Sequence, residues 1–162
     1  MQLQRNNMIL TTTVKADLAT LYLFQLNKEA NYLAAFTGPE PLTKEAYINK
    51  YEPFLSNPTI HMCTIKIEDK IVGSIAKYEM ENEAEITYWI DREFWGQGIA
   101  TNALTEFLKI ELIRPIYGRT AFDNFGSQKV LENCGFVKIG TDKGFAKARN
   151  EEIEEYIYKL AE

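Results

Sequence analysis

The stretch "EAEITYWIDREFWGQGIATNAL" (residues 83–104) changes its periodicity in the middle. Polar and apolar residues alternate as far as Ile90, which predicts a strand, and apolar residues then recur at helical spacing from about residue 99. Gly96 and Gly98 lie between the two patterns. Glycine allows positive φ and close approach of the backbone, and the start of a helix presents unpaired N–H groups. The stretch therefore predicts either a plain turn or a seat for an anionic phosphate.

Two well-known phosphate loops do not fit these glycines. A dinucleotide-binding loop requires a third glycine at position 101, where the chain has Thr101. A P-loop requires four residues between its glycines and a following Lys-Ser/Thr, and this stretch has neither.

The remaining sequence surrounds this stretch with alternating strand and helix patterns. Asp17 and Thr43 are candidate caps for the first two helices, the first helix having apolar residues at helical spacing as far as Leu33. Asp123 or Asn124 is the candidate cap for the last helix, and Gly135 suits its left-handed end. The predicted order is β-α-α-β-β-β-α-β-α-β-β, with strands at 8–14, 59–67, 70–80, 83–90, 115–122, 136–148 and 151–161.

Length and composition bound the class of protein. The 162 residues predict a single domain, 1–162, with a core of about 8–162. A net charge of -5 without a Lys/Arg run argues against a nucleic-acid partner, and no apolar run is long enough for a membrane span. The opening "MQLQRNNMIL" has no apolar h-region, so a cytoplasmic location is expected. Cys63 and Cys134 lack metal-ligand spacing, so we expect two structural thiols and no metal.

The second half of the chain resembles the GNAT superfamily of acyl-CoA-dependent N-acetyltransferases. The resemblance rests on residues 83–104 and on "TAFDNFGSQKVLENCGF" (residues 120–136), and the element order extends it over nearly the whole chain. The Rim-type branch, which acetylates ribosomal-protein N-termini, is the most similar. The resemblance implies an α+β, three-layer fold, in which a mixed, V-split sheet of about seven strands is flanked by about four helices.

The family's loop pattern, Arg/Gln-x-x-Gly-x-Gly/Ala, falls on Trp95, Gly98 and Ala100. Trp95 departs from the Arg or Gln of that pattern, and we expect it to pack beneath the loop. By the resemblance, acetyl-CoA is the cosubstrate and backbone N–H groups of the loop cradle its pyrophosphate. The end of the preceding strand pairs with the pantetheine arm. The implied contacts are Trp89, Ile90 and Asp91 on the strand, and Gly96, Gln97, Gly98, Ile99, Ala100 and Thr101 in the loop and helix.

The family's second motif, Asn-x-x-Ser before a helix ending in Gly-Phe, falls on Asn124 and Ser127. The resemblance implies that Asn124 bonds the pantetheine amides and that Ser127 lies near the thioester sulfur. In the family a tyrosine usually acts as the general acid, and this chain has Leu131 at that position. Ser127 therefore becomes the candidate acid. Lys129 is a candidate for the 3'-phosphate. Three alternatives remain: local capping by Asn124, Ser127 as a merely polar residue of the first helical turn, and a solvated Lys129.

The implied activity is acetyl transfer to a primary amine, either a protein N-terminus or a small molecule. Glu85 matches the position of a catalytic glutamate in some family members, and it is the candidate base. A solvent-facing strand carboxylate is the alternative. The family binds its acceptor with segments that correspond to residues 26–41 and 139–154. The acidic run at 151–155 would suit a cationic amine, but a solvated strand or turn is the commoner explanation of such a run.

Two other classes of protein remain open from the sequence. A non-catalytic acyl-CoA-binding or sensing module would keep the cofactor cleft without using an acceptor, and a purely structural domain would bind no cofactor. The expected assembly is a monomer or a homodimer.

Overall fold

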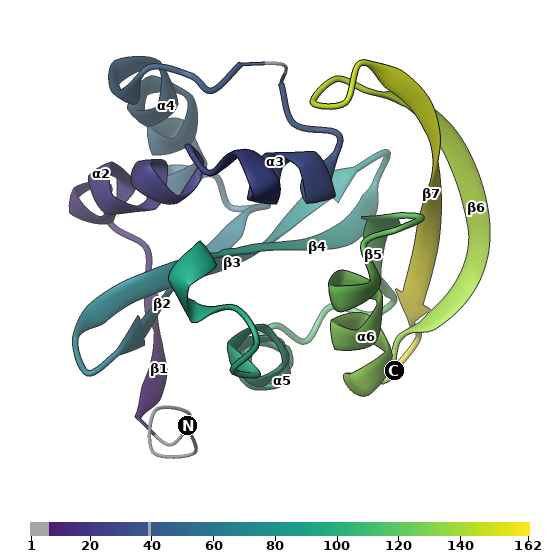
Figure 1. Ribbon diagram of the computed structural model, residues 1–162. Helices are drawn as coiled ribbons and strands as arrows, with labels where there is room; N and C mark the ends of the chain where they lie inside the picture. The colour runs from purple at the N-terminus through teal and green to yellow at the C-terminus, as the bar shows by residue number, and fades with distance from the viewer. Residues whose placement is uncertain (1–6, 39) are drawn as a thin grey trace.

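The computed structural model describes residues 7–38 and 40–162, so residues 1–6 of the predicted domain and Pro39 lie outside the description. Figure 1 shows a central sheet with helices on both faces. The strands are β1 (Met8–Thr12), β2 (His61–Ile67), β3 (Lys70–Met80), β4 (Glu83–Ile90), β5 (Ile116–Ala121), β6 (Val137–Ala146) and β7 (Glu151–Leu160). The α-helices are α2 (Lys15–Phe24), α3 (Lys28–Ala34), α4 (Lys44–Tyr51), α5 (Ile99–Ile110) and α6 (Phe125–Asn133), and short 3-10 turns form η1 (Glu52–Ser56) and η2 (Arg92–Phe94).

The seven strands form one mixed sheet in the order β1-β2-β3-β4-β5-β7-β6. The predicted antiparallel meander of β2, β3 and β4 is confirmed. Two-residue turns join these strands, and both residues of each turn have positive φ, at Glu68 and Asp69 and again at Glu81 and Asn82. This conformation matches the twist of antiparallel strands and fixes their register.

The sheet is split between β4 and β5, the one parallel pair in the described part of the chain. Only Ala84 with Ile116 and Glu85 with Tyr117 are paired across it. β5 pairs along its whole length with β7 on its other side. The strands therefore separate after Glu85, which confirms the V-split sheet.

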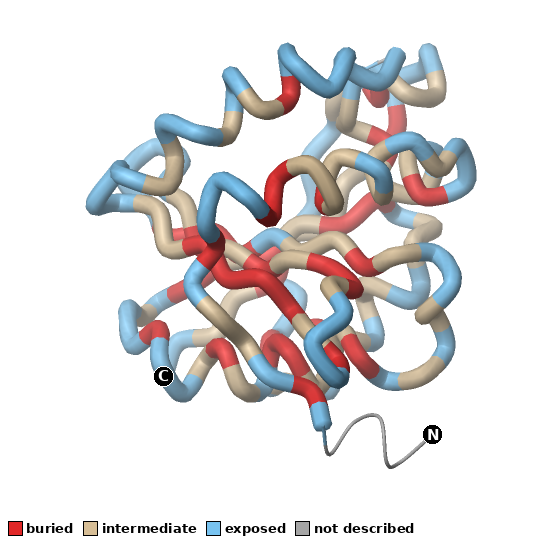
Figure 2. Tube along the Cα trace, turned by 90° about the vertical axis from the view of Figure 1, so that its left-hand side faces the viewer, coloured by how far each residue is buried: buried red, intermediate tan, exposed pale blue. Residues whose placement is uncertain are grey.

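Helices cover the two faces of the sheet unequally. On one face α2 packs against α4 and β3, and α3 contacts β5; on the other face α5 packs against β1, β3 and β4, and α6 against β5. The larger core lies under α5 and includes Ile75, Ile99, Leu104 and Phe107. Figure 2 shows that buried residues follow the central strands and the helix sides that face them.

The first predicted helix is two helices in the structure, which raises the number of α-helices from about four to five. Asp17 is not the N-cap: Val14 is, and Asp17 accepts a hydrogen bond from the Val14 N–H at 3.1 Å from inside the first turn. Asn27 then caps α3 by accepting from the Ala30 N–H at 2.8 Å. An Asn side chain that bonds the backbone locally favours the start of a new helix over a continuous one. The helical spacing of apolar residues as far as Leu33 therefore predicted one helix where the structure has two.

The predicted cap at Thr43 is confirmed, because its hydroxyl accepts from the Ala46 N–H at 3.2 Å. None of the helices in the described residues has the length and apolar character needed to cross a membrane.

Candidate active site

The gap between β4 and β5 exposes backbone groups of β4. The Asp91 N–H donates to the Val72 carbonyl at 2.8 Å, so it is directed toward β3. Because the direction of backbone groups alternates along an antiparallel pair, Trp89 also faces β3, whereas Tyr88 and Ile90 face the gap. Of the three residues predicted to pair with pantetheine, Ile90 alone directs its backbone there, and the prediction for the backbones of Trp89 and Asp91 is wrong.

Trp95 uses its side chain to hold the end of β4. Its indole N–H donates to the Ile90 carbonyl at 3.0 Å, the ring packs against the main core, and the Arg92 guanidinium lies 4.5 Å from the ring centre. The expected packing beneath the loop is confirmed. Because the Ile90 carbonyl is occupied, the Ile90 N–H is the group of this residue that remains directed at the gap.

The glycine loop turns the chain sharply from β4 into α5. Gly96 and Gly98 have φ values of 80° and 76°, in the left-handed region that favours glycine. No described side chain caps α5, and the Asn102 N–H is the first to bond back to the Gly98 carbonyl, at 3.0 Å. The preceding N–H groups at 99–101 therefore form a helix N-terminus of the kind that binds anions.

A cleft of about 860 Å³ follows this loop and the gap. It brings together most of the predicted site residues: Trp89, Ile90, Gly96, Gly98, Ile99, Ala100, Thr101, Asn124, Ser127 and Lys129. Glu85, Asp91 and Gln97 are not among its lining residues. Asp91 instead accepts from the Glu93 N–H at 3.2 Å and caps η2.

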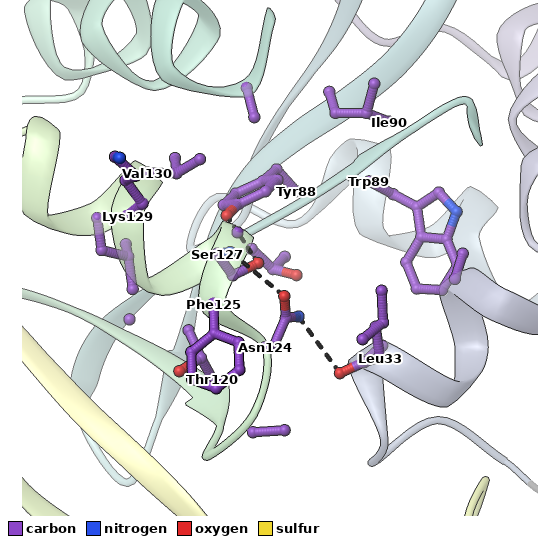
Figure 3. A pocket seen from close by; sticks show the side chains of 18 of the residues that line it. Leu33, Tyr88, Trp89, Ile90, Thr120, Asn124, Phe125, Ser127, Lys129 and Val130 are labelled. Carbon is purple, nitrogen blue, oxygen red and sulfur yellow. Dashed lines mark hydrogen bonds between the residues drawn. The ribbon is translucent and has the colours of Figure 1, made fainter. Parts of the chain in front are cut away.

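Tyr88 is a site residue that the sequence analysis missed. Its hydroxyl donates to the Ser127 hydroxyl oxygen at 2.9 Å, across the gap from β4 to α6 (Figure 3). Burial raises the pKa of Tyr88 to about 12, so the phenol stays protonated near neutral pH. Alternation along a strand places the Tyr88 and Glu85 side chains on opposite faces of the sheet, and only the position of α6 shows what the Tyr88 hydroxyl meets.

The oxygen and the nitrogen of the Asn124 side-chain amide each make a hydrogen bond (Figure 3). The side-chain oxygen accepts from the Ser127 N–H at 3.3 Å, which confirms the predicted helix cap, and the nitrogen donates to the Leu33 carbonyl at 3.3 Å. Asn124 thus joins α6 to α3 across the cleft. A contact with pantetheine stays a prediction and would use the second N–H of the same amide.

Glu85 is buried, with 2% of its surface exposed, and its Oε2 lies 3.5 Å from the Arg119 Nε. Burial raises the pKa of this carboxyl, and the charge of Arg119 opposes the rise. The other carboxylate oxygen, Oε1, has no hydrogen-bond partner among the described residues. The alternative of a solvent-facing carboxylate is therefore excluded.

The described residues bring no group of three His, Cys, Asp or Glu side chains together at a metal site. His61 pairs with Glu111 at 3.1 Å and is not among the residues lining the cleft. Burial raises the pKa of Cys63 to about 11, as expected for a structural thiol.

A mixed sheet split at its parallel pair, with a helix N-terminus and a serine–tyrosine pair beside the split, defines a cleft-forming α+β domain. A model of the acetyltransferase (GNAT) domain matches residues 7–137. The chain therefore belongs to the GNAT acetyltransferase family.

Similar proteins agree with this assignment. N-acetyltransferase p20 of Bacillus licheniformis is 29% identical over 104 residues, which span 59% of this chain and 58% of that protein. Among solved structures, the microcin C7 self-immunity acetyltransferase MccE with acetyl-CoA and AMP has a TM-score of 0.80 at 20% identity, covering 97% of this chain and 93% of that one.

Two more solved structures share the fold. RimL, a ribosomal L7/L12 α-N-protein acetyltransferase in complex with coenzyme A, has a TM-score of 0.79 at 18% identity, covering 96% and 94% of the two chains. Spermidine N-acetyltransferase from Vibrio cholerae, with CoA and spermine, has a TM-score of 0.78 at 19% identity, covering 95% and 96%. Rim-type proteins are thus one group among several neighbours.

Replacing Gly98 with Val tests the loop. A β-branched residue at positive φ is strained by about 1–2 kcal/mol, and relief of the strain would displace the first turn of α5. We expect CoA affinity, measured by titration calorimetry, to fall by about tenfold or more, since each tenfold step is about 1.4 kcal/mol. Gly140→Val is the control, because a Cβ there meets nothing within 4 Å. Unchanged affinity in a folded Gly98→Val protein would contradict the loop assignment.

Proposed function

We propose that this chain moves an acetyl group from acetyl-CoA to a primary amine by direct attack within a ternary complex. The observation that carries the proposal is the opening between β4 and β5, with the α5 N-terminus at its mouth and the Tyr88–Ser127 pair beside it. Such an opening admits an extended arm between two strand edges. The N–H groups at the α5 N-terminus suit the pyrophosphate.

The described residues fit acetyl-CoA as a cosubstrate without a metal. The backbone of residues 97–101 would hold the pyrophosphate, Asn124 the pantetheine arm, and Lys129 the 3'-phosphate, as an exposed ammonium lining the cleft. Acetyl-CoA supplies a thioester whose carbonyl carbon accepts the amine nitrogen as its C–S bond breaks. The Ile90 N–H, directed at the gap, would donate to the carbonyl oxygen.

Ser127 would return a proton to the departing sulfur. A hydroxyl has one proton, and because Ser127 accepts from Tyr88 at 2.9 Å, its own proton is free to point elsewhere. A free thiol has a pKa of about 8.5, so its thiolate leaves with modest help. Leu131, at the position where the family usually has a tyrosine, lies in the main core. The phenol beside α6 is instead that of Tyr88, on β4.

The amine must lose a proton before or during attack. A lysine amine with a pKa of about 10.4 is only about 0.04% neutral at pH 7, whereas an α-amine near 7.7–8 is roughly a tenth neutral. Glu85 is our candidate base, because its raised pKa suits proton acceptance. Since Glu85 lies behind Arg119 rather than on the cleft surface, the proton would reach it through water.

Two classes of amine are candidates for the acceptor. The Rim-type resemblance favours a protein N-terminus, whereas the spermidine acetyltransferase shares the fold with a small-molecule polyamine bound. A monomer or homodimer remains our expectation for the assembly.

An acceptor screen tests the proposed function. We expect acetyl-CoA to release free CoA in the presence of one or more amines from a panel of N-terminal peptides, polyamines and small amines. Mass spectrometry should show a gain of one acetyl group on the amine. Tight acetyl-CoA binding with no turnover on any amine would favour the non-catalytic acyl-CoA-binding module. Absence of any thermal stabilisation by acetyl-CoA would favour a structural domain, because a ligand at 100 times its Kd adds about 2.7 kcal/mol.

Ser127→Ala and Tyr88→Phe test the leaving-group assignment. We expect kcat at saturating acetyl-CoA to fall by about tenfold or more in Ser127→Ala and by a smaller factor in Tyr88→Phe. The double variant should be no slower than Ser127→Ala, since Tyr88 acts through Ser127. Tyr51→Phe, remote from the cleft, is the control. Additive losses would show that Tyr88 does not act through Ser127.

Glu85→Gln tests the base. The wild-type rate should rise as the pH increases through the raised pKa of Glu85, because only the ionised carboxylate accepts a proton. In the variant the rate should no longer rise through this pH range and should be lower by about 10²-fold at neutral pH. Its CoA affinity should be retained. Glu83→Gln, which removes an exposed carboxylate on the same strand, should keep the rise of the rate with pH, moved slightly to lower pH because the charge of Glu83 helps to raise the pKa of Glu85. If the Glu85→Gln profile overlays the wild type, Glu85 is not the base.

A further inference from the structure

One wall of the cleft carries a cluster of charges from four strands. Arg119 on β5 and Glu155 on β7 line the cleft, and Glu85 on β4 lies behind them. The Arg119 Nη1 donates to the Glu155 Oε1 at 3.2 Å and lies 3.6 Å from Asp142, while its Nε is 3.5 Å from Glu85. The single guanidinium is therefore shared by three carboxylates.

Two of these carboxylates are largely removed from water. The side chains of Glu85 and Glu155 are 2% and 19% exposed, whereas that of Asp142 is 60% exposed and solvated. A buried carboxylate without its own counter-ion is costly. The pKa of Glu155 is raised, chiefly by burial and against the charge of Arg119. The cluster is thus short of one positive charge.

The other two charged residues that line the cleft, Asp123 and Lys129, do not supply a positive charge beside Glu155. Asp123 is held by Arg149 in a two-pronged pair at 2.7 and 2.8 Å. Lys129 lies on α6, on the side of the gap where Tyr88 meets Ser127. The cleft lining also includes apolar and aromatic residues, among them Leu33, Phe36 and Tyr78, and Tyr78 is close enough to Glu155 for the two to interact electrostatically.

We infer that Glu155 binds the ammonium group of the acceptor, and that this subsite selects amines without a neighbouring carboxylate or phosphate. The ammonium would supply the missing charge, and the apolar wall would contact the body of the molecule. An acceptor anion would face Glu155 with no unpaired cation beside it, because Arg119 is already neutralised. The inference rests on the proposed function and names its acceptor class: a cationic amine on an apolar or amide-bearing body.

Binding of matched amine pairs to the CoA-saturated protein tests this inference without any turnover. The probes are phenylalaninamide and alaninamide, each compared with its free amino acid, which differs by a carboxylate in place of the amide. Titration calorimetry is done at about pH 6.5, where α-amines are cationic. We expect at least one amide to bind about tenfold or more tightly than its acid. In Glu155→Gln we expect the amide to lose about tenfold in affinity and this preference to shrink.

Glu154→Gln is the matched control, because it makes the same change one residue away at an exposed position outside the cleft lining. It should keep the wild-type preference. Equal binding of amide and acid, an unchanged preference in Glu155→Gln, or no binding of either amide would each overturn the inference. Acetyl transfer in the acceptor screen could still succeed in these cases, so failure here is distinguishable from failure of the proposed function.

Discussion

The site depends on the early end of hydrogen bonding between β4 and β5. Two residue pairs join these strands, and after Glu85 each strand leaves its neighbour. The separation is supported from outside: β5 is held along its length by β7, and β4 is held by β3. An unpaired edge in the middle of a sheet would ordinarily be unfavourable, because buried N–H and C=O groups need partners. A ligand arm entering between the edges would supply them.

The two sides of the split serve different parts of the proposed reaction. Tyr88 directs its hydroxyl to Ser127 on α6, whereas the indole N–H of Trp89 donates to the Phe24 carbonyl of α2 at 3.0 Å. This is the strand alternation that the sequence predicts, seen in three dimensions. The cofactor and leaving-group machinery therefore lies with α5 and α6. In the proposed reaction the amine would approach along the charged wall of Glu155 and Arg119 and past α3, whose residues also line the cleft.

Sequence patterns predicted the elements well where local signals agreed. The β2–β4 meander, the glycine loop and the Asn124 cap all follow from turn chemistry and periodicity. The prediction failed at Asp17 and at the continuous first helix, because capping within one turn outweighs apolar spacing. It also failed for the backbones of Trp89 and Asp91, since the pairing direction along a strand depends on the partner's register.

By itself, the sequence determined the order of strands and helices and the sharp turn at Gly96 and Gly98, since these are local signals carried by periodicity and turn chemistry. The split of the sheet and the choice of Ser127 as the candidate acid came from the resemblance to the family. Tertiary structure alone decided which side chains meet across elements. It brought the Tyr88 hydroxyl to Ser127, 39 positions along the chain, and placed Glu85 behind Arg119 with Glu155 on the cleft wall. Such contacts depend on the packing of distant elements, and no single stretch of the chain contains both partners.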